Sequence, residues 1–156
     1  MITVTKSYRD LPAAHRQPNH DGHCRLIHGH NWGFDITFAC RELDANGFVI
    51  DVGKLKAVKQ WLERHFDHTL LLNEDDPHLQ FLENTLQQHS LFLTDIVIVP
   101  NCGMEGLARF VATSLNGQGR VLFGEEAHSR CVRIVSVTCH EDGKNSATYV
   151  CDDKLP

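Results

Sequence analysis

The hydrophobic pattern of this chain changes period along its length, which limits the folds open to it. Apolar and polar residues alternate over residues 2–8 and again in a longer run over residues 30–43. A period of two is typical of strands that bury one face. From residue 53 to about residue 67, apolar residues instead recur every three or four positions, which predicts a helix. The chain is therefore expected to combine strands and helices.

Later segments extend this mixed pattern. Helices are expected from Pro77, with Leu79, Leu82 and Leu86 inward, and over residues 104–115. Further extended segments are predicted at residues 48–51, 95–99, 133–141 and 147–150, the last two joined by a polar turn. This order favours an α+β domain over alternating β-α-β units. Because the 156 residues include no linker-like stretch and no repeat, residues 1–156 are expected to form a single domain.

The composition argues against several classes of protein. Hydrophobic residues make up 42% and charged residues 22% of the chain, close to the globular average. A net charge of -5 lacks the basic excess of a nucleic-acid binder. No apolar run approaches the roughly 20 residues that span a bilayer, and the first residues do not resemble a secretory signal. We therefore expect a soluble, cytoplasmic protein with neither nucleic-acid nor membrane partners, whose six cysteines are reduced thiols.

Histidine is over-represented, with 11 residues, and two of them fall in the most informative segment, residues 24–30. His28 and His30 are two positions apart on a predicted strand, so both imidazoles point to one face. A catalytic zinc ion takes three protein ligands and keeps one position for water or substrate. We expect His15 to be the third ligand, because it follows two small residues that allow tight packing. Two histidines in the intervening loop compete for this place, His20 and His23.

Five further side chains are candidates for chemistry beside such a metal, and most have a structural alternative. Cys24 precedes the histidine pair and is either a fourth ligand that closes the site or a thiol that acts as general base. Asp67 and His68 follow a predicted helix, and form either a pair for proton transfer or a cap of the helix C-terminus. Glu105 opens a predicted helix, where acidic residues are favoured. Glu141 ends a strand, where a carboxylate can accept paired N–H groups from a flat heterocycle.

These motifs, taken in order, resemble those of one enzyme family. The motifs that carry the resemblance are Ala13-Ala14-His15, Cys24-x-x-x-His28-Gly29-His30-Asn31, Asp51-x-x-x-Leu55-Lys56, Asp67-His68-x-x-Leu71, Glu105 and Glu141. Over nearly its whole length the chain resembles the 6-pyruvoyltetrahydropterin synthase and 6-carboxytetrahydropterin synthase family. The resemblance implies a tunnelling fold, in which helices pack on one face of an antiparallel sheet and subunits combine their sheets into an oligomeric barrel. It also implies a homohexamer with active sites between subunits.

The resemblance further implies a reaction and a set of functional residues. These are the zinc ligands His15, His28 and His30, the catalytic residues Cys24, Asp67 and His68, and the substrate-binding residues Glu141, Glu105 and Gly103. Carboxy-forming members convert 7,8-dihydroneopterin triphosphate to 6-carboxy-5,6,7,8-tetrahydropterin, releasing acetaldehyde and triphosphate, a step towards queuosine and other deazapurines. We expect this lyase reaction with Zn²⁺ as cofactor. The alternatives are pyruvoyl-forming elimination of triphosphate and a non-catalytic zinc-binding assembly protein of the same fold.

Two segments depart from the family pattern. Where many members have a Pro-Thr-x-Glu run, this chain has Cys102-Gly103-Met104-Glu105, so a hydroxyl that helps to hold the pterin is absent and Gly103 or its backbone is expected to substitute. Residues 74–100 are longer than in compact members and are expected to include an extra helix. A triphosphate also requires a local basic patch. The candidates by position are Arg16, Arg25 and Lys54.

Overall fold

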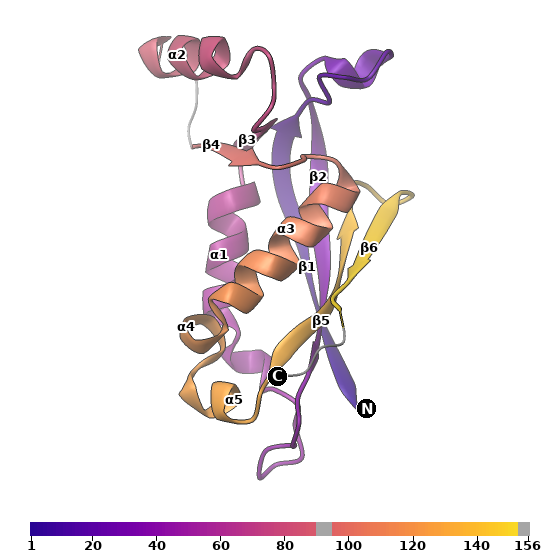
Figure 1. Ribbon diagram of the computed structural model, residues 1–156, viewed down its shortest axis with the longest axis vertical. Coiled ribbons are helices and arrows are strands. Elements are labelled where there is room, and N and C mark those ends of the chain that lie inside the picture. Colours follow the sequence, from indigo (N-terminus) through magenta and orange to yellow (C-terminus); the bar gives the residue numbers. More distant parts are fainter. Residues whose placement is uncertain (90–94, 153–156) are drawn as a thin grey trace.

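Six strands form one curled sheet in the computed structural model, which describes residues 1–89 and 95–152 (Figure 1). The order across the sheet is β4-β3-β1-β2-β5-β6. The strands are β1 (Thr3–His15), β2 (His28–Ala39), β3 (Thr69–Asn73), β4 (Ile96–Val99), β5 (Arg133–His140) and β6 (Ser146–Val150). The helices are α1 (Lys56–Phe66), α2 (Leu79–His89), α3 (Met104–Gly117), α4 (Gly119–Phe123) and α5 (Glu125–Ser129), with two 3-10 turns at His23–Arg25 and Val52–Lys54. The predicted mixture of strands and helices is confirmed.

The sheet is mixed rather than wholly antiparallel. Strands β1, β2, β5 and β6 pair antiparallel, as predicted. In contrast, β3 pairs parallel with both β1 and β4. The segment from β3 through α2 to β4 is therefore a β-α-β unit, which the sequence pattern argued against. The pattern does not reveal β3 because all five of its residues are buried, so apolar and polar residues do not alternate along it.

Helices α1 and α3 lie against one face of the sheet and enclose the core (Figure 1). The inward side chains of β2 alternate as predicted, and the fully buried ones are Trp32, Phe34, Ile36 and Phe38. The predicted apolar faces of the two helices are confirmed; their buried residues are Val58, Trp61, Leu62 and Phe66 in α1 and Leu107, Ala108, Val111, Ala112 and Leu115 in α3. Burial of these side chains supplies the main stabilising free energy and holds α3 against the sheet.

Strand β1 is longer than the sequence pattern predicts. It continues past Tyr8 to His15 through an irregularity between Tyr8 and Leu11, where Asp10 has a φ of 63°. A bulge of this kind adds a residue to the strand, so the side chains after it point to the opposite face from the one that strict alternation predicts. The periodic pattern therefore stops at Tyr8 although the strand does not. This extension is functionally important because it brings His15 to the end of β1.

The middle of the chain departs further from the prediction. Residues 48–51 form bends and irregular backbone rather than a strand. Helix α2 begins at Leu79 rather than Pro77 and lies apart from α1 and α3 (Figure 1), and its inward-predicted leucines are only half-buried. It belongs to the long segment 74–100, of which residues 90–94 lie outside the described residues. Helices α4 and α5 have no predicted counterpart, because five residues are too few to show a helical period.

Two expectations from composition can be compared with the structure. All six cysteines lie in the described part of the chain and are free thiols. Cys102 and Cys139 are fully buried, whereas the other four are half-buried: Cys24, Cys40, Cys131 and Cys151. Across residues 1–89 and 95–152, none of the helices combines the length and the apolar character that crossing a membrane requires.

The face of the sheet opposite the helices is polar. Two hydroxyl pairs join neighbouring strands, Thr5 with Thr37 and Thr138 with Thr148. Asp35 on β2 accepts a hydrogen bond from Arg9 on β1 and lies against His140 on β5, each at 2.7 Å. This ion-paired cluster ties three strands together close to the end of β5. The sheet thus has one apolar face that the helices cover and one polar face that they do not.

Tyr8 carries a buried hydroxyl that has no hydrogen-bond partner among the described residues. Burial raises the pKa of this phenol from 10.0 to about 12. The contribution of the neutral phenol to the free energy of unfolding is fully present below about pH 10. It is lost as the pH rises towards 12, because Tyr8 ionises at a lower pH in the unfolded chain than in the folded one. Tyr8→Phe is expected to raise the free energy of unfolding by about 1 kcal/mol at neutral pH, since it removes an unsatisfied buried group. It is also expected to abolish the alkaline loss.

Denaturant unfolding of both proteins, near pH 7 and near pH 11, measures these two effects. The stability gain of the phenylalanine variant should be larger at the higher pH. A variant that is less stable than the wild type near pH 7 contradicts the assignment, because it means that the hydroxyl has a stabilising partner.

Candidate metal centre and active site

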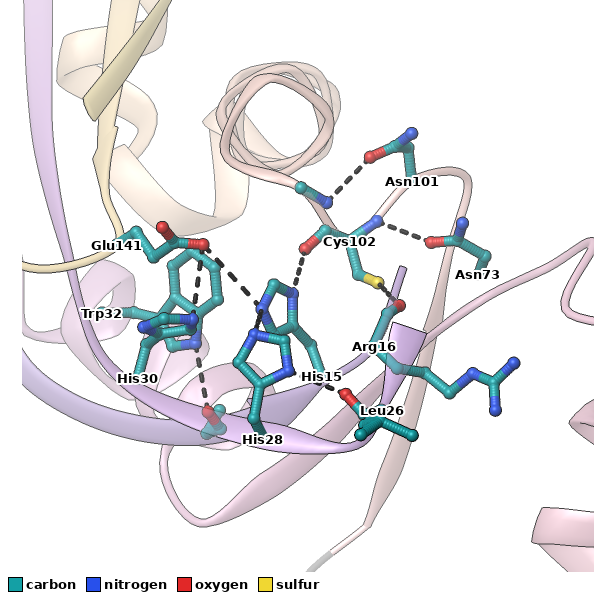
Figure 2. Close-up of polar contacts among 12 residues, drawn as sticks. His15, Arg16, Leu26, His28, His30, Trp32, Asn73, Asn101, Cys102 and Glu141 are labelled. Atoms are coloured by element: carbon teal, nitrogen blue, oxygen red, sulfur yellow. Dashed lines mark hydrogen bonds and ion pairs between the residues drawn. The ribbon is translucent and has the colours of Figure 1, made fainter. Parts of the chain in front are cut away.

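Three histidines meet where β1 and β2 lie side by side (Figure 2). His15 ends β1 and His28 begins β2, and the antiparallel register places them directly opposite each other. The Nε2 atoms of these two residues are 3.1 Å apart. One ring nitrogen from each of His15, His28 and His30 lies within 4.8 Å of the other two, which makes this trio the candidate metal site of the described chain. The loop histidines that competed in the sequence, His20 and His23, do not belong to it.

The hydrogen bonds of two rings leave their facing nitrogens without protons. His15 Nδ1 lies 2.7 Å from the carbonyl oxygen of Cys102, and His28 Nδ1 lies 2.7 Å from that of Leu26 (Figure 2). A carbonyl oxygen only accepts, so each Nδ1 carries the proton and each Nε2 presents a lone pair. Two lone pairs at 3.1 Å repel each other unless a cation lies between them. Nitrogen ligands of tetrahedral zinc, with bonds of about 2.0–2.1 Å, lie roughly 3.3 Å apart, so the arrangement fits such an ion.

Burial also suits these rings to metal binding. His15 is 2% exposed, and burial lowers its pKa to about 4, although its hydrogen bond to Cys102 acts in the opposite direction. The Nε2 atom of His30 is buried and has no hydrogen-bond partner among the described residues. Burial lowers the pKa of His30 too, opposed by Glu141, whose Oε1 lies 3.4 Å from Nε2. Neutral imidazole is the form that binds metals, so both rings are in that form at neutral pH.

A pocket of about 320 Å³ opens beside the histidines. Cys24 lines it from the 3-10 turn between β1 and β2, Glu105 from the first turn of α3, and Glu141 from the end of β5. The backbone N–H of Gln17 donates to the carbonyl of Cys24 at 2.8 Å and so holds this turn near the end of β1. The other lining residues are His15, Gln17, His28, Asn101, Gly103 and Met104. Of the predicted zinc ligands, catalytic residues and pterin-binding residues, all but Asp67 and His68 lie in this pocket or in the histidine cluster beside it.

Gly103 lines this pocket, but its backbone groups are already engaged. Its N–H donates to Asn101 Oδ1 at 2.8 Å, and its carbonyl accepts the N–H of Leu107 at 2.9 Å within α3. A Cβ atom at this position would lie 2.8 Å from Nε2 of Gln17. Because the amide end of the Gln17 side chain can move aside, this contact does not by itself require glycine at residue 103. The N–H of Gly103 is already bonded to Asn101, so it does not take the place of the missing hydroxyl in this structure.

Asp67 and His68 form the predicted pair but do not line this pocket. His68 Nδ1 lies 2.6 Å from Asp67 Oδ1, and the imidazole side chain is 63% exposed. The pair follows α1, and Asp67 is the C-cap residue of that helix. Asp67 lines a different cavity, which residues of β1 and α1 enclose. Within one chain the pair and the pocket of Cys24 are therefore separate features.

The three basic residues predicted for a triphosphate do not line the pocket either. Arg16 Nε lies 3.0 Å from Asp76 Oδ2, and the aspartate side chain is fully buried, so Arg16 is engaged in an ion pair inside the chain. Arg25 and Lys54 are exposed, and each is the last residue of one of the two 3-10 turns. Arg16 is therefore engaged within its own chain through Nε and does not line this pocket.

Two residues that support the histidine cluster have no evident signal in the sequence. Cys102, fully buried, contacts His15 through its carbonyl oxygen. Asn73, the last residue of β3, contacts Cys102 through its side chain at 2.8 Å. Both interactions join residues far apart in the chain, and one of them uses the backbone, which any residue type carries. Periodicity and spacing therefore could not identify them.

Comparison with known proteins agrees with the resemblance drawn from the motifs. Residues 3–151 match the family model of 6-pyruvoyl tetrahydropterin synthase. The chain is 36% identical over 95 residues to 6-carboxy-5,6,7,8-tetrahydropterin synthase from Rickettsia felis, covering 60% of this chain and 68% of that protein. It is 39% identical over 80 residues to the protein of the same name from Rickettsia typhi, covering 51% of this chain and 57% of that protein. Both relatives are thus named as tetrahydropterin synthases.

Solved structures with the same fold include members of this family. An uncharacterized protein from Wolinella succinogenes gives a TM-score of 0.78 at 19% identity, covering 97% of this chain and 98% of that chain. The 6-pyruvoyl tetrahydropterin synthase of Caenorhabditis elegans gives a TM-score of 0.56 at 23% identity, with the same coverage of 97% and 98%. Because the family model spans nearly the whole chain and the fold agrees with it, this protein belongs to the 6-pyruvoyl tetrahydropterin synthase family.

Proposed function

We propose that this protein is a zinc-dependent 6-carboxy-5,6,7,8-tetrahydropterin synthase. It converts 7,8-dihydroneopterin triphosphate to 6-carboxytetrahydropterin with release of acetaldehyde and triphosphate, as a cytoplasmic step in queuosine and other deazapurine biosynthesis. The observation that carries the proposal is the pair of facing Nε2 lone pairs, 3.1 Å apart, beside a pocket that also holds a thiol and two carboxylates. The names of the curated relatives favour the carboxy product over the pyruvoyl product.

Each group in the pocket has a distinct task in this proposal. His15, His28 and His30 would hold the zinc ion, which when bound would take the hydroxyl groups of the substrate side chain at its remaining coordination position and make them more acidic. Cys24, beside that position, moves the proton as general base. Glu141 and Glu105 accept hydrogen bonds from the N–H groups of the pterin ring. The chain thereby holds the ring while a proton moves at the side chain, and C–C cleavage needs no redox cofactor.

We further propose that Asp67 and His68 serve the pocket of a neighbouring subunit. The pair is exposed and does not line the pocket of its own chain, which supports this placement. Open sheet edges also support assembly: β3 pairs only with residues 13–15 of β1, so among the described residues the first part of β1 has no partner on that side, and β6 ends the sheet at the other side. Open edges pair readily with other strands. A homo-oligomer results, a hexamer by family resemblance.

The proposed activity is tested by incubating zinc-loaded protein with 7,8-dihydroneopterin triphosphate and identifying the products by mass spectrometry. 6-Carboxytetrahydropterin, acetaldehyde and triphosphate are the expected products, and chelator-stripped protein is expected to form them only after zinc is restored. 6-Pyruvoyltetrahydropterin with triphosphate identifies the alternative reaction. An absence of turnover at full zinc occupancy contradicts an enzyme and leaves a zinc-binding assembly protein of the same fold.

A further inference from the structure

A chain of hydrogen bonds leads from His15 to a buried amide outside the pocket. Cys102 lies in the loop between β4 and α3 and is fully buried, and Asn73 at the end of β3 is 4% exposed. Oδ1 of Asn73 accepts the backbone N–H of Cys102 at 2.8 Å. The carbonyl oxygen of the same cysteine then accepts Nδ1–H of His15 at 2.7 Å (Figure 2). Only Cys102 therefore lies between the side-chain amide of Asn73 and the predicted metal ligand His15 in this chain of hydrogen bonds.

Three contacts hold Cys102 in a single orientation. Its N–H donates to Asn73, its carbonyl accepts from His15, and its thiol donates to the carbonyl of Arg16 at 3.0 Å. Each contact uses a different group of the cysteine, and the partners come from two segments: His15 and Arg16 at the end of β1, and Asn73 at the end of β3. Rotation of this peptide unit therefore breaks at least one of them, and the carbonyl remains directed at His15.

The sheet and an ion pair anchor the other end of this chain of bonds. The parallel register places Asn73 opposite Val99, and the N–H of Glu74 donates to the carbonyl of Val99 at 2.9 Å. Asp76 forms its ion pair with Arg16, the residue that follows His15. Asn73 is therefore fixed relative to β4 on one side and to the end of β1 on the other.

His28 provides a contrast within the same cluster. Its Nδ1 donates to Leu26, only two residues away, and Leu26 is 60% exposed. That bond is local to one loop. The Nδ1 bond of His15 instead depends on a residue 87 positions away in sequence and is fully buried. The orientation of His15 is consequently a property of the tertiary structure and rests on what holds Cys102.

We propose that Asn73 is a positioning residue for the metal ligand His15, acting through the backbone of Cys102. By fixing the Cys102 carbonyl, Asn73 keeps the proton on Nδ1 of His15 and the lone pair of Nε2 directed at the metal. Partners of this kind, bonded to the second ring nitrogen of a ligating histidine, typically contribute about 10–100-fold to metal affinity. The inference rests on the proposed metal site and adds to it a residue outside the pocket.

The test is the dissociation constant of Zn²⁺ for the full chain, measured by competition with a chromophoric chelator. Asn73→Leu keeps the side-chain volume but removes the acceptor, and is expected to weaken zinc binding about 10–100-fold. Asn73→Asp keeps an acceptor oxygen and is expected to retain near-wild-type affinity, although a second buried carboxylate close to Asp76 lowers its thermal stability. If the zinc affinity falls in step with the thermal stability in both variants, the effect is one of folding and the proposal is overturned.

A matched control and a second pair of variants separate positioning from folding. Asn116 bonds both backbone groups of Ile134, at 2.9 and 2.8 Å, so Asn116→Leu is expected to lower stability with no change in zinc affinity. Cys102→Ala removes the thiol donor and is expected to weaken zinc binding, whereas Cys102→Ser is expected to restore it. Wild-type zinc affinity in Asn73→Leu overturns the role of Asn73, whatever the affinity of Cys102→Ala. A wild-type chain that binds no zinc contradicts the metal site itself, and with it the proposed function.

Discussion

Cys24→Ala is expected to lower turnover of 7,8-dihydroneopterin triphosphate by about 10²–10⁴-fold, the usual contribution of a positioned general base. Zinc content should not change, because Cys24 lines the pocket beside His15 and His28 but is not part of the three-histidine group. Product formation under steady-state conditions and zinc content by mass spectrometry measure the two effects on the same sample. A variant that loses zinc together with activity makes Cys24 a fourth ligand and contradicts its role as base.

Another cysteine of the same chain provides the control. Cys40 is half-buried and packs against the edge of the core, outside the pocket. Cys40→Ala therefore changes the same functional group without touching the proposed site. It is expected to retain both turnover and zinc, so that an effect confined to Cys24→Ala is attributable to the position of the thiol and not to the loss of any one thiol.

The inactive Cys24 variant also tests where the Asp67–His68 pair acts. If each pocket combines Cys24 of one subunit with His68 of another, then Cys24→Ala and His68→Ala chains complement each other. Co-refolding equal amounts of the two inactive variants is expected to restore about a quarter of the wild-type turnover, since each site draws independently on two subunits. A mixture as inactive as its components means that the pair and the thiol act within one chain. A His68→Ala chain that is fully active on its own means that the pair has no catalytic role.

His28→Ala is expected to weaken zinc binding by well over 100-fold, because even the loss of a residue that only supports a ligand costs about 10–100-fold. His28 suits this test better than His15, since it is half-buried whereas His15 is buried beside Trp32, so its replacement disturbs the core less. Chelator competition measures affinity, and circular dichroism checks that the variant remains folded.

The control for this prediction is a neighbouring histidine outside the cluster. The ring centroid of His23 lies 6.5 Å from that of His28, in the same loop region, yet His23 is not one of the three grouped residues. His23→Ala is expected to bind zinc as the wild type does. Unchanged affinity in His28→Ala, or an equal loss in both variants, contradicts the assignment of the ligands.

The parts of the fold that were predicted correctly share one property: the hydrophobic pattern that identifies each of them lies within a single helix or strand. The alternation along β2 and the apolar faces of α1 and α3 follow from the period of each element, and the structure confirms them. Where the local signal is absent the prediction failed. β3 is buried throughout and shows no alternation, the bulge at Asp10 interrupts the pattern of β1, and the parallel pairing of β3 with β4 joins segments that are distant in sequence.

The sequence by itself determined the chemistry available to this protein. Two histidines at a spacing of two on one strand, a cysteine four residues before the first, and acidic residues at the ends of a helix and a strand are properties of residue type and spacing. Only the tertiary structure decided how these groups meet. The antiparallel register sets His15 against His28, the carbonyl of Cys102 selects the tautomer of His15, and the Asp67–His68 pair lies away from the pocket of its own chain. Hydrogen bonds between distant segments fix each of these relations, and such bonds leave no trace in a periodic pattern.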